Sequence, residues 1–353
     1  DDQFTPVLAM DWMGLMEDYQ DSVNVAAEVL LNTDMSKVEE IYNLVNSARS
    51  MLRYQIVGNP LNIQIMRSTA TYDDLMNYQA YMNGIEYYDF LGAVLEQLST
   101  DSDVVVKELE GIRDMVMNRE NMTVLFAGND SGIETFRGSI SGVIDQVKQG
   151  SIVRQDYSDI PRPSSREGIA IDTQVQYNML SASYDMLGVE FDGKYMPVAM
   201  FLKENYLYPQ IRYMYGAYDM LLEFTDDYIV MGSYRDPNID ETYEVYEGIP
   251  EFLESMSELP QEYLDRYILN AYGNYTIPSG ELSGAVAAMT NHLKGKTAED
   301  SLEVLRAMKA LTASDFKEVA GMFRTLLEKG TYNTVGSPEK LNSTEMFDSI
   351  VTF

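Results

Sequence analysis

Cysteine is absent from this chain of 353 residues, and histidine occurs only once, as His292. Without cysteine the protein can form no disulfide and perform no thiolate chemistry. A catalytic zinc site needs about three protein ligands and an open coordination position, and the residues around His292 match no metal-binding motif. We therefore expect that this chain alone binds no catalytic metal.

Basic residues are scarce as well. The chain has 25 lysines and arginines against 56 aspartates and glutamates, which gives a formal net charge of −31. Nucleic acids and anionic membranes are bound by clustered basic side chains, so we expect neither as a partner. The acidic charge favours attraction of basic peptides, although it can also serve solubility alone.

Long apolar runs are lacking too. No segment approaches the roughly 18 apolar residues of a membrane-spanning helix, and residues 1–4 lack the basic and apolar regions of a signal peptide. The cytoplasm and the outside of the cell are both compatible with this composition, so the compartment is unknown. What the chain does have is 45% hydrophobic and 11% aromatic residues, which is typical of globular proteins.

The length favours two domains. Residues 151–168 carry Pro161, Pro163 and several serine, arginine and aspartate residues, a composition typical of a linker. We therefore expect a first domain over residues 1–150 and a second over residues 169–353.

The first domain is predicted to be rich in helices. Apolar spacing predicts strands over residues 4–10 and 122–128. It predicts helices over residues 17–31, 36–58, 73–98, 102–118 and 131–149. A layered α+β domain needs more strands to cover so many helices, so we expect further strands upstream of this sequence.

The second domain mixes the two kinds of element without strict alternation, which favours an α+β fold over a doubly wound sheet. Strands are predicted within residues 169–184 and 331–335, and a hairpin over residues 217–234 that turns at Asp226-Asp227. Helices are predicted over residues 194–208, 238–256 with a kink at Pro250, 260–272, 279–294, 298–311 and 314–328.

The candidate functional residues lie at the start of this hairpin. Arg212 stands six positions before Tyr218, and Gly216-Ala217 comes directly before that tyrosine. A fixed guanidinium and a phenol in such a turn can hold a polarised carbonyl or an oxyanion between them.

Several segments together resemble the C-terminal half of presequence proteases, zinc metallopeptidases of the insulinase/pitrilysin superfamily. The resemblance covers most of the chain. It is carried by residues 26–45, 81–98, 118–130, 211–220 and 233–238, in that order and spacing.

The resemblance implies a fold and a division of labour. The fold is two successive α+β domains, each a mostly antiparallel sheet with helices on one face, the first domain being truncated at its N-terminus. Zinc in the complete enzyme is bound by an inverted H-x-x-E-H motif in the N-terminal half. That half, in the same polypeptide or a separate subunit, and peptide substrates are the implied partners, and this chain alone is expected to be inactive.

The family pattern R-x-x-G-G-A-Y-G corresponds here to residues 212–219. Arg212, Gly216, Ala217 and Tyr218 match it, whereas Tyr215 and Asp219 replace glycines. The resemblance implies that Arg212 and Tyr218 bind the substrate carbonyl and stabilise the tetrahedral intermediate.

Two other hypotheses remain open. The chain can be a catalytically inactive homologue that acts as a peptide-binding or scaffold protein, which the replaced glycines favour. Alternatively, Asp236-x-Asn238-x-Asp240 imitates a calcium loop in an acidic, calcium-stabilised protein, although Glu241 stands where such a loop needs glycine.

Overall fold

The computed structural model describes residues 4, 6–151, 155–277 and 280–353. By its internal contacts the chain divides into two units. Unit 1 comprises residues 1–51, 88–157 and 280–285, and unit 2 comprises residues 52–87, 158–279 and 286–353. The predicted division into successive domains at residues 151–168 stays a prediction, and each unit is described by itself.

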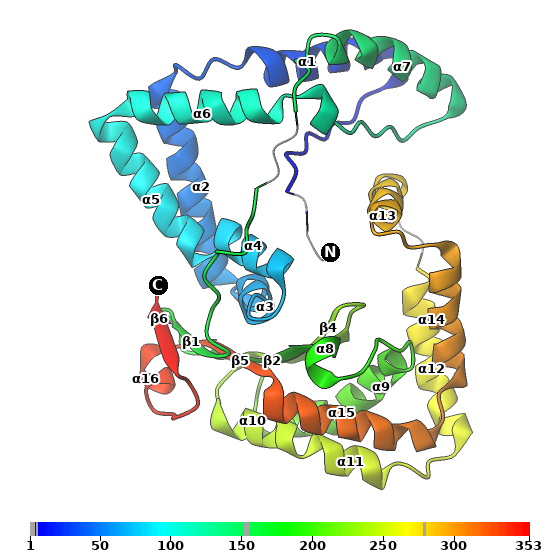
Figure 1. The fold of residues 1–353 in the computed structure, drawn as a ribbon. Coiled ribbons are helices and arrows are strands. Elements are labelled where there is room, and N and C mark those ends of the chain that lie inside the picture. Colours follow the sequence, from blue (N-terminus) through cyan, green and yellow to red (C-terminus); the bar gives the residue numbers. More distant parts are fainter. Residues whose placement is uncertain (1–3, 5, 152–154, 278–279) are drawn as a thin grey trace. The chain divides into compact units, whose positions relative to one another are not determined.

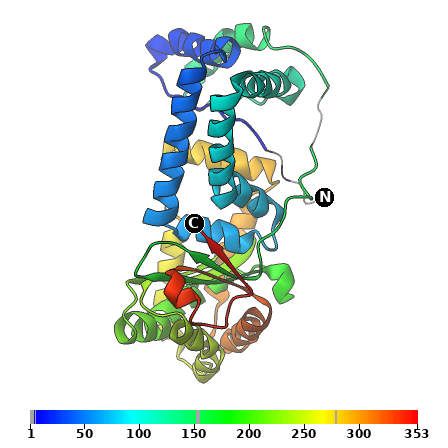
Figure 2. The ribbon, with the colours of Figure 1, turned by 90° about the vertical axis from the view of Figure 1, so that its left-hand side faces the viewer.

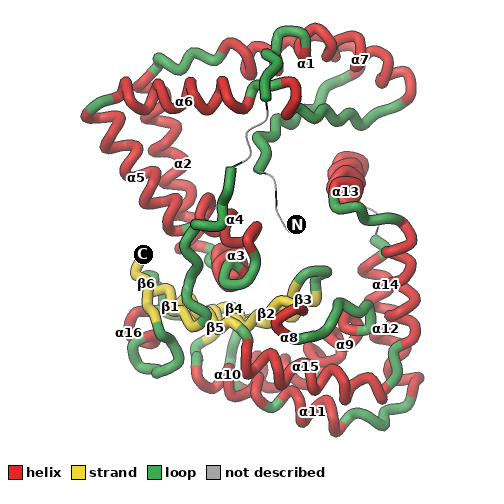
Figure 3. Tube along the Cα trace, viewed as in Figure 1, coloured by secondary structure: helices red, strands yellow, loops and turns green. Residues whose placement is uncertain are grey.

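Within the described residues of unit 1, the regular elements are all helices, joined by loops (Figure 3). It contains all or part of η1 (Met16–Asp18), α1 (Tyr19–Asn32), α2 (Val38–Gly58), α5 (Ile85–Thr100), α6 (Ser102–Val116), η2 (Arg119–Asn121), α7 (Asp130–Ile144) and α13 (Glu281–Leu293). The helices predicted in this region are therefore present.

Aromatic side chains hold α1 against α7. The ring of Tyr19 meets Phe126 and Phe136 edge-on at centroid distances of 5.7 and 5.9 Å, and those two phenylalanines stack at 4.8 Å. In α2, the Nε of Arg49 donates to the carbonyl oxygen of Tyr88 in α5 at 3.2 Å, and its guanidinium lies over the Tyr88 ring. These contacts orient pairs of helices that have few fully buried side chains of their own.

Two predicted strands of the first half are wrong. Residues 122–128 form no strand: Leu125 is 51% exposed, and Phe126 packs against the rings of Tyr19 and Phe136 of helices instead of in a sheet. Residues 4 and 6–10 form no strand either, with Val7 80% exposed, whereas residue 5 lies outside the described residues.

Unit 2 is built on one six-stranded sheet in the order β3-β4-β2-β5-β1-β6 (Figures 1 and 3). Neighbours pair antiparallel from β3 to β5, whereas β1 runs parallel to both β5 and β6. The strands are β1 (Arg166–Ala170), β2 (Gln176–Ser183), β3 (Asp219–Phe224), β4 (Tyr228–Asp236), β5 (Thr331–Gly336) and β6 (Ser349–Thr352). The predicted α+β class with a mostly antiparallel sheet is confirmed, as is the hairpin that turns at Asp226-Asp227.

The helices of unit 2 that contact one face of this sheet are α8 (Tyr184–Leu187), α9 (Tyr195–Leu202), η3 (Lys203–Met214) and α15 (Phe316–Lys329) (Figures 1 and 2). The helices that pack against these are α10 (Asp240–Glu247), α11 (Ile249–Ser255), α12 (Gln261–Tyr275), α14 (Ala298–Ala310) and η4 (Ala313–Asp315), and α16 (Pro338–Leu341) contacts β1 and β5. The amphipathic α15 shows the basis of this packing: Phe316, Val319, Phe323 and Leu326 recur at helical spacing and are at most 2% exposed. Burying such a stripe against the sheet forms the main apolar core of the unit.

Breaks between helices follow glycine and proline. The predicted helix 73–98 is divided into α4 (Asp74–Asn83) and α5 at Gly84, where a Cβ would collide with the carbonyl oxygen of Ala80. The predicted kink at Pro250 is a break between α10 and α11 at Gly248. No helix within the described ranges is long and apolar enough to cross a membrane.

The other face of the sheet is covered by α3 (Leu61–Thr69), a helix that the sequence did not predict, through a polar interface. The amide nitrogen of Gln64 donates to the carbonyl oxygens of Tyr177 at 2.5 Å and Asn333 at 2.9 Å. The hydroxyls of Ser68 and Ser181 lie 2.6 Å apart. The helix therefore bonds directly to the backbone and side chains of the central strands.

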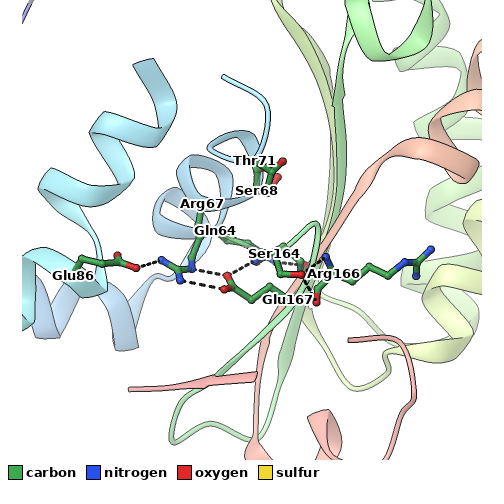
Figure 4. A network of polar contacts seen from close by, with 9 residues as sticks. Gln64, Arg67, Ser68, Thr71, Glu86, Ser164, Arg166 and Glu167 are labelled. Atoms are coloured by element: carbon green, nitrogen blue, oxygen red, sulfur yellow. Dashed lines mark hydrogen bonds and ion pairs between the residues drawn. The ribbon is translucent and has the colours of Figure 1, made fainter. Parts of the chain in front are cut away.

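A buried ion pair completes this interface (Figure 4). Arg67 donates to both carboxylate oxygens of Glu167, from Nε at 2.5 Å and from Nη2 at 3.1 Å, and from Nη1 to Glu86 at 2.7 Å. The side chains of Arg67 and Glu167 are 8% and 3% exposed. Burial raises the pKa of Glu167 more than Arg67 lowers it. Burial lowers the pKa of Arg67, but the two carboxylates outweigh it and raise that pKa.

Candidate functional site

Arg212 lies in the last turn of η3, which has the wide winding of a π-helix and contains Pro209. At its end the backbone N–H of Tyr215 donates to the carbonyl oxygen of Gln210 at 3.1 Å, a bond that spans five residues. Short π-type bulges are rare and are frequent at functional sites. This turn therefore places Arg212 in an uncommon backbone setting.

The chain reverses directly after this helix and returns to the sheet. Gly216 has φ of +84°, which glycine adopts without steric cost. The backbone N–H of Ala217 then donates to the carbonyl oxygen of Ile211 at 3.1 Å, and that of Tyr218 to Tyr234 of β4 at 3.0 Å. The reversal brings Tyr218 back beside Arg212.

The two predicted side chains lie together. The Cζ of Arg212 is 5.9 Å from the centre of the Tyr218 ring and 5.7 Å from that of Tyr208, within the range of cation–π attraction. The side chain of Arg212 is 43% exposed, and Tyr218 is 63% exposed. Both donors are accessible to a ligand.

Asp219, which replaces a glycine of the family pattern, anchors this arrangement. Its Oδ1 lies 4.0 Å from Nη1 of Arg212 and accepts hydrogen bonds from the Tyr208 hydroxyl at 3.0 Å and the Met220 N–H at 2.7 Å. Burial and the hydrogen bond to Asp219 raise the pKa of Tyr208. Asp219 thus holds Tyr208 firmly and Arg212 loosely.

The structure adds residues that sequence reasoning missed as site residues. The Tyr234 ring lies 6.1 Å from that of Tyr218 at an angle of 60°, and Tyr177 lies 5.2 Å from Tyr234. Arg235 places its Cζ 5.5 Å from the Tyr234 ring. The only sequence signal for Tyr234 and Arg235 is their presence in the segment 233–238, which carried part of the family resemblance, and Tyr177 had no such signal.

Asp236 and Asn238 fix the backbone next to this cluster through hydrogen bonds. The buried Asp236 carboxylate accepts from Thr242 Oγ1 at 2.6 Å and from the backbone N–H of Asn238 at 2.9 Å. The Asn238 amide donates to the carbonyl oxygen of Tyr215 at 3.0 Å. Two residues of the segment that imitates a calcium loop, Asp236 and Asn238, are therefore engaged in fixing the turn between η3 and β3.

The described residues contain no group of three or more His, Cys, Asp or Glu side chains that could hold a metal ion. His292 is exposed near the end of α13. The side chains that the structure describes do not fit a catalytic zinc.

Two family models match the chain. The "PreP C-terminal domain" model matches residues 166–336, which include Arg212, Tyr218 and Arg235. The "Peptidase M16C associated" model matches residues 1–94.

Curated relatives match over nearly the whole chain. "Protein HypA" of Clostridium perfringens is 25% identical over 99% of this chain and 36% of its own length. "Presequence protease 1, chloroplastic/mitochondrial" of Arabidopsis thaliana is 23% identical over 94% of this chain and 30% of its own length. The chain thus spans about a third of the length of these relatives.

The fold is also that of a solved peptidase structure. Pitrilysin superposes with a TM-score of 0.63 at 11% identity, over 96% of this chain and 36% of the pitrilysin chain. At this identity the likeness shows the fold alone.

Proposed function

Because the chain belongs to the insulinase family, as the C-terminal half of a presequence-protease-like member, we propose that it forms the substrate-clamping half of a zinc metallopeptidase that degrades short, unstructured peptides. The adjacency of two exposed donors, Arg212 and Tyr218, supports this proposal most directly. In it, the zinc and its ligands belong to the N-terminal half, since the described residues here offer no ligand group. The chain alone is then inactive.

The proposed task of the two side chains is to bind the carbonyl oxygen of the scissile peptide bond. When a nucleophile adds to that carbonyl, negative charge develops on its oxygen. The guanidinium of Arg212 and the hydroxyl of Tyr218 both donate hydrogen bonds, and preorganised donors at this position favour the transition state over the ground state. The π-helical turn and the Tyr218–Tyr234 backbone bond provide that preorganisation.

The experiment needs the full polypeptide, or this chain combined with its N-terminal half. Removal of one such donor typically lowers the catalytic rate by about 10²–10³-fold. We expect this loss in kcat for Arg212→Ala and a comparable loss for Tyr218→Phe, with smaller changes in KM.

Two surface residues on other elements provide matched controls. Arg306→Ala removes an exposed arginine of α14 that pairs with Glu299, and Tyr272→Phe alters an exposed tyrosine of α12. Both controls are expected to keep the parent rate. Parent rates in Arg212→Ala and Tyr218→Phe as well would remove the proposal.

One observation favours a second candidate, a non-enzymatic peptide-binding or scaffold homologue. Asp219 stands where the family pattern has glycine, and its carboxylate lies 4.0 Å from the Arg212 guanidinium, where it offsets part of the positive charge. In that case the full polypeptide binds peptides without cleaving them, and Arg212→Ala weakens binding while no turnover is measured in any variant.

A further inference from the structure

Strand β4 contains one extra residue beside the candidate site. Gln176 of β2 pairs with Asp236, whereas Asn178 pairs with Ser233, so that Tyr177 alone faces both Tyr234 and Arg235. This is a β-bulge, a feature that bends a strand locally and often re-aims a side chain next to an active site.

The bulge is strained. Arg235 has φ of +49° and is the only residue other than glycine with a positive φ in the described parts of the chain. The left-handed region costs free energy for a residue that carries a Cβ, and glycine avoids that cost. Strained backbone that persists next to a binding site motivates a functional hypothesis.

The strained backbone delivers an exposed guanidinium to the tyrosine cluster. Arg235 lies over Tyr234, whose ring lies beside that of Tyr218. The Arg235 guanidinium also interacts with the Tyr177 hydroxyl, which raises the pKa of Arg235. Tyr177 is only 4% exposed, so this contact ties a surface cation to a fixed, buried partner.

Among the residues that the structure describes, no carboxylate pairs with Arg235. None of the ion pairs found among the described residues includes it, although the chain has 56 acidic residues. The neighbouring Asp236 carboxylate is buried and occupied by Thr242 and Asn238. A guanidinium that is oriented by aromatic rings and left unpaired is preorganised for an external anion.

We propose that Arg235 is a second anchoring residue of the substrate site and binds a carboxylate of the peptide whose scissile carbonyl lies at Arg212 and Tyr218. This inference rests on the proposed function and extends it by a specificity element. Guanidinium and carboxylate form two parallel hydrogen bonds, and the rings of Tyr218 and Tyr234, inclined at 60° to each other, provide an aromatic surface between the two arginines for the intervening peptide. A peptide that is basic along its length but ends in a free carboxylate suits both the net charge of −31 and Arg235.

The test uses Arg235→Gly in the full polypeptide, because glycine keeps the left-handed backbone while it removes the guanidinium. We expect the melting temperature to stay equal or rise, since the strain is relieved. We expect KM for a carboxylate-bearing peptide to rise about tenfold, in keeping with the loss of a charged hydrogen bond, at an unchanged kcat. Arg235→Lys keeps the charge without the two parallel bonds, so its KM should lie between those of wild type and Arg235→Gly.

The peptides identify the source of the carboxylate. If the C-terminus provides it, amidation of that end abolishes the difference between wild type and Arg235→Gly. If an acidic side chain provides it, replacement of glutamate by glutamine in the peptide abolishes the difference instead.

An affinity that Arg235→Gly leaves unchanged for every peptide would overturn the inference. That failure is distinct from failure of the proposed function, which would show as an unchanged kcat in Arg212→Ala and Tyr218→Phe. Peptide affinity, measured by equilibrium binding, tests Arg235 even if the full polypeptide turns nothing over. Arg306→Ala again serves as the arginine control.

Discussion

Arg67 and Arg212 are arginines in the same unit with opposite surroundings. Arg67 is 8% exposed and donates three hydrogen bonds to two carboxylates. Arg212 is 43% exposed, and its one ion pair, with Asp219, spans 4.0 Å. Each guanidinium nitrogen of Arg67 donates to a carboxylate, whereas Arg212 is held in place mainly by aromatic rings and keeps its donors accessible. The comparison separates a cation that stabilises the fold from one that is available to a ligand.

The largest expected effect concerns the buried pair. Glu167→Ala leaves Arg67 in the interface with only Glu86, and loss of one partner of a buried ion pair costs about 3–5 kcal/mol. Denaturant unfolding of the 353-residue chain measures this loss.

The matched control for that variant is Glu299→Ala, which breaks the exposed pair with Arg306. An exposed ion pair such as this one contributes about 0–1 kcal/mol to the free energy of unfolding. Equal losses in the two variants would mean that burial does not distinguish the two kinds of arginine in this chain.

A smaller effect is expected for the neutral part of the same interface. Gln64→Leu removes the donor that the carbonyl oxygens of Tyr177 and Asn333 share. Although the carbonyl oxygen of Asn333 still accepts from the Tyr243 hydroxyl, we expect a cost of about 1–3 kcal/mol. Tyr218→Phe removes a hydroxyl from an exposed ring and should change the free energy of unfolding by less than about 0.5 kcal/mol. Thermal unfolding of both variants sharpens the comparison, and a large loss in Tyr218→Phe would make that residue structural.

The smallest effect is a difference in pH dependence between two glutamates paired with arginine. Burial raises the pKa of Glu167, so its contribution to stability is complete below the unfolded value of about 4.3 and is lost as the pH rises through the folded pKa. The hydrogen bond from Arg324 lowers the pKa of the exposed Glu254, so its contribution is present above about 4.3 and is lost as the pH falls through the folded pKa.

Glutamine variants at the two positions measure this difference. Unfolding free energies of wild type, Glu167→Gln and Glu254→Gln between pH 3 and 7 should give differences of opposite slope. Parallel slopes would mean that the same balance of forces governs the buried and the exposed pair.

Whether an element buries apolar or polar side chains explains whether the sequence predicted it. Helix α15 and the hairpin β3–β4 bury apolar side chains at regular spacing, so their patterns are visible in the sequence. Helix α3 was missed because the face that it buries carries Gln64, Arg67 and Ser68, which a pattern of hydrophobicity treats as exposed. Conversely, residues 122–128 are apolar but lie partly exposed in an irregular segment, so the same pattern predicted a strand that does not exist.

The residues at the candidate site also differ in whether the sequence could predict them. The match of residues 212–219 to the family pattern carried the prediction of Arg212 and Tyr218, and the structure brings them together. Arg235 could not have been predicted from spacing, because its position depends on a bulge and on a backbone angle that arginine rarely adopts. Its place beside Tyr234 follows from the pairing of β2 with β4.

The place of β5 in the sheet has a consequence for synthesis of the protein. This strand lies between β1 and β2, yet its residue Asn333 stands 269 positions after Gln64, the α3 residue to which it bonds. At a synthesis rate of about 5–20 residues per second, roughly 15 to 50 seconds pass at the ribosome between the synthesis of Gln64 and that of Asn333. Until β5 is made, α3 can contact β2 but not β5, and the glutamine, arginine and serine side chains of its buried face favour contact with water in the meantime.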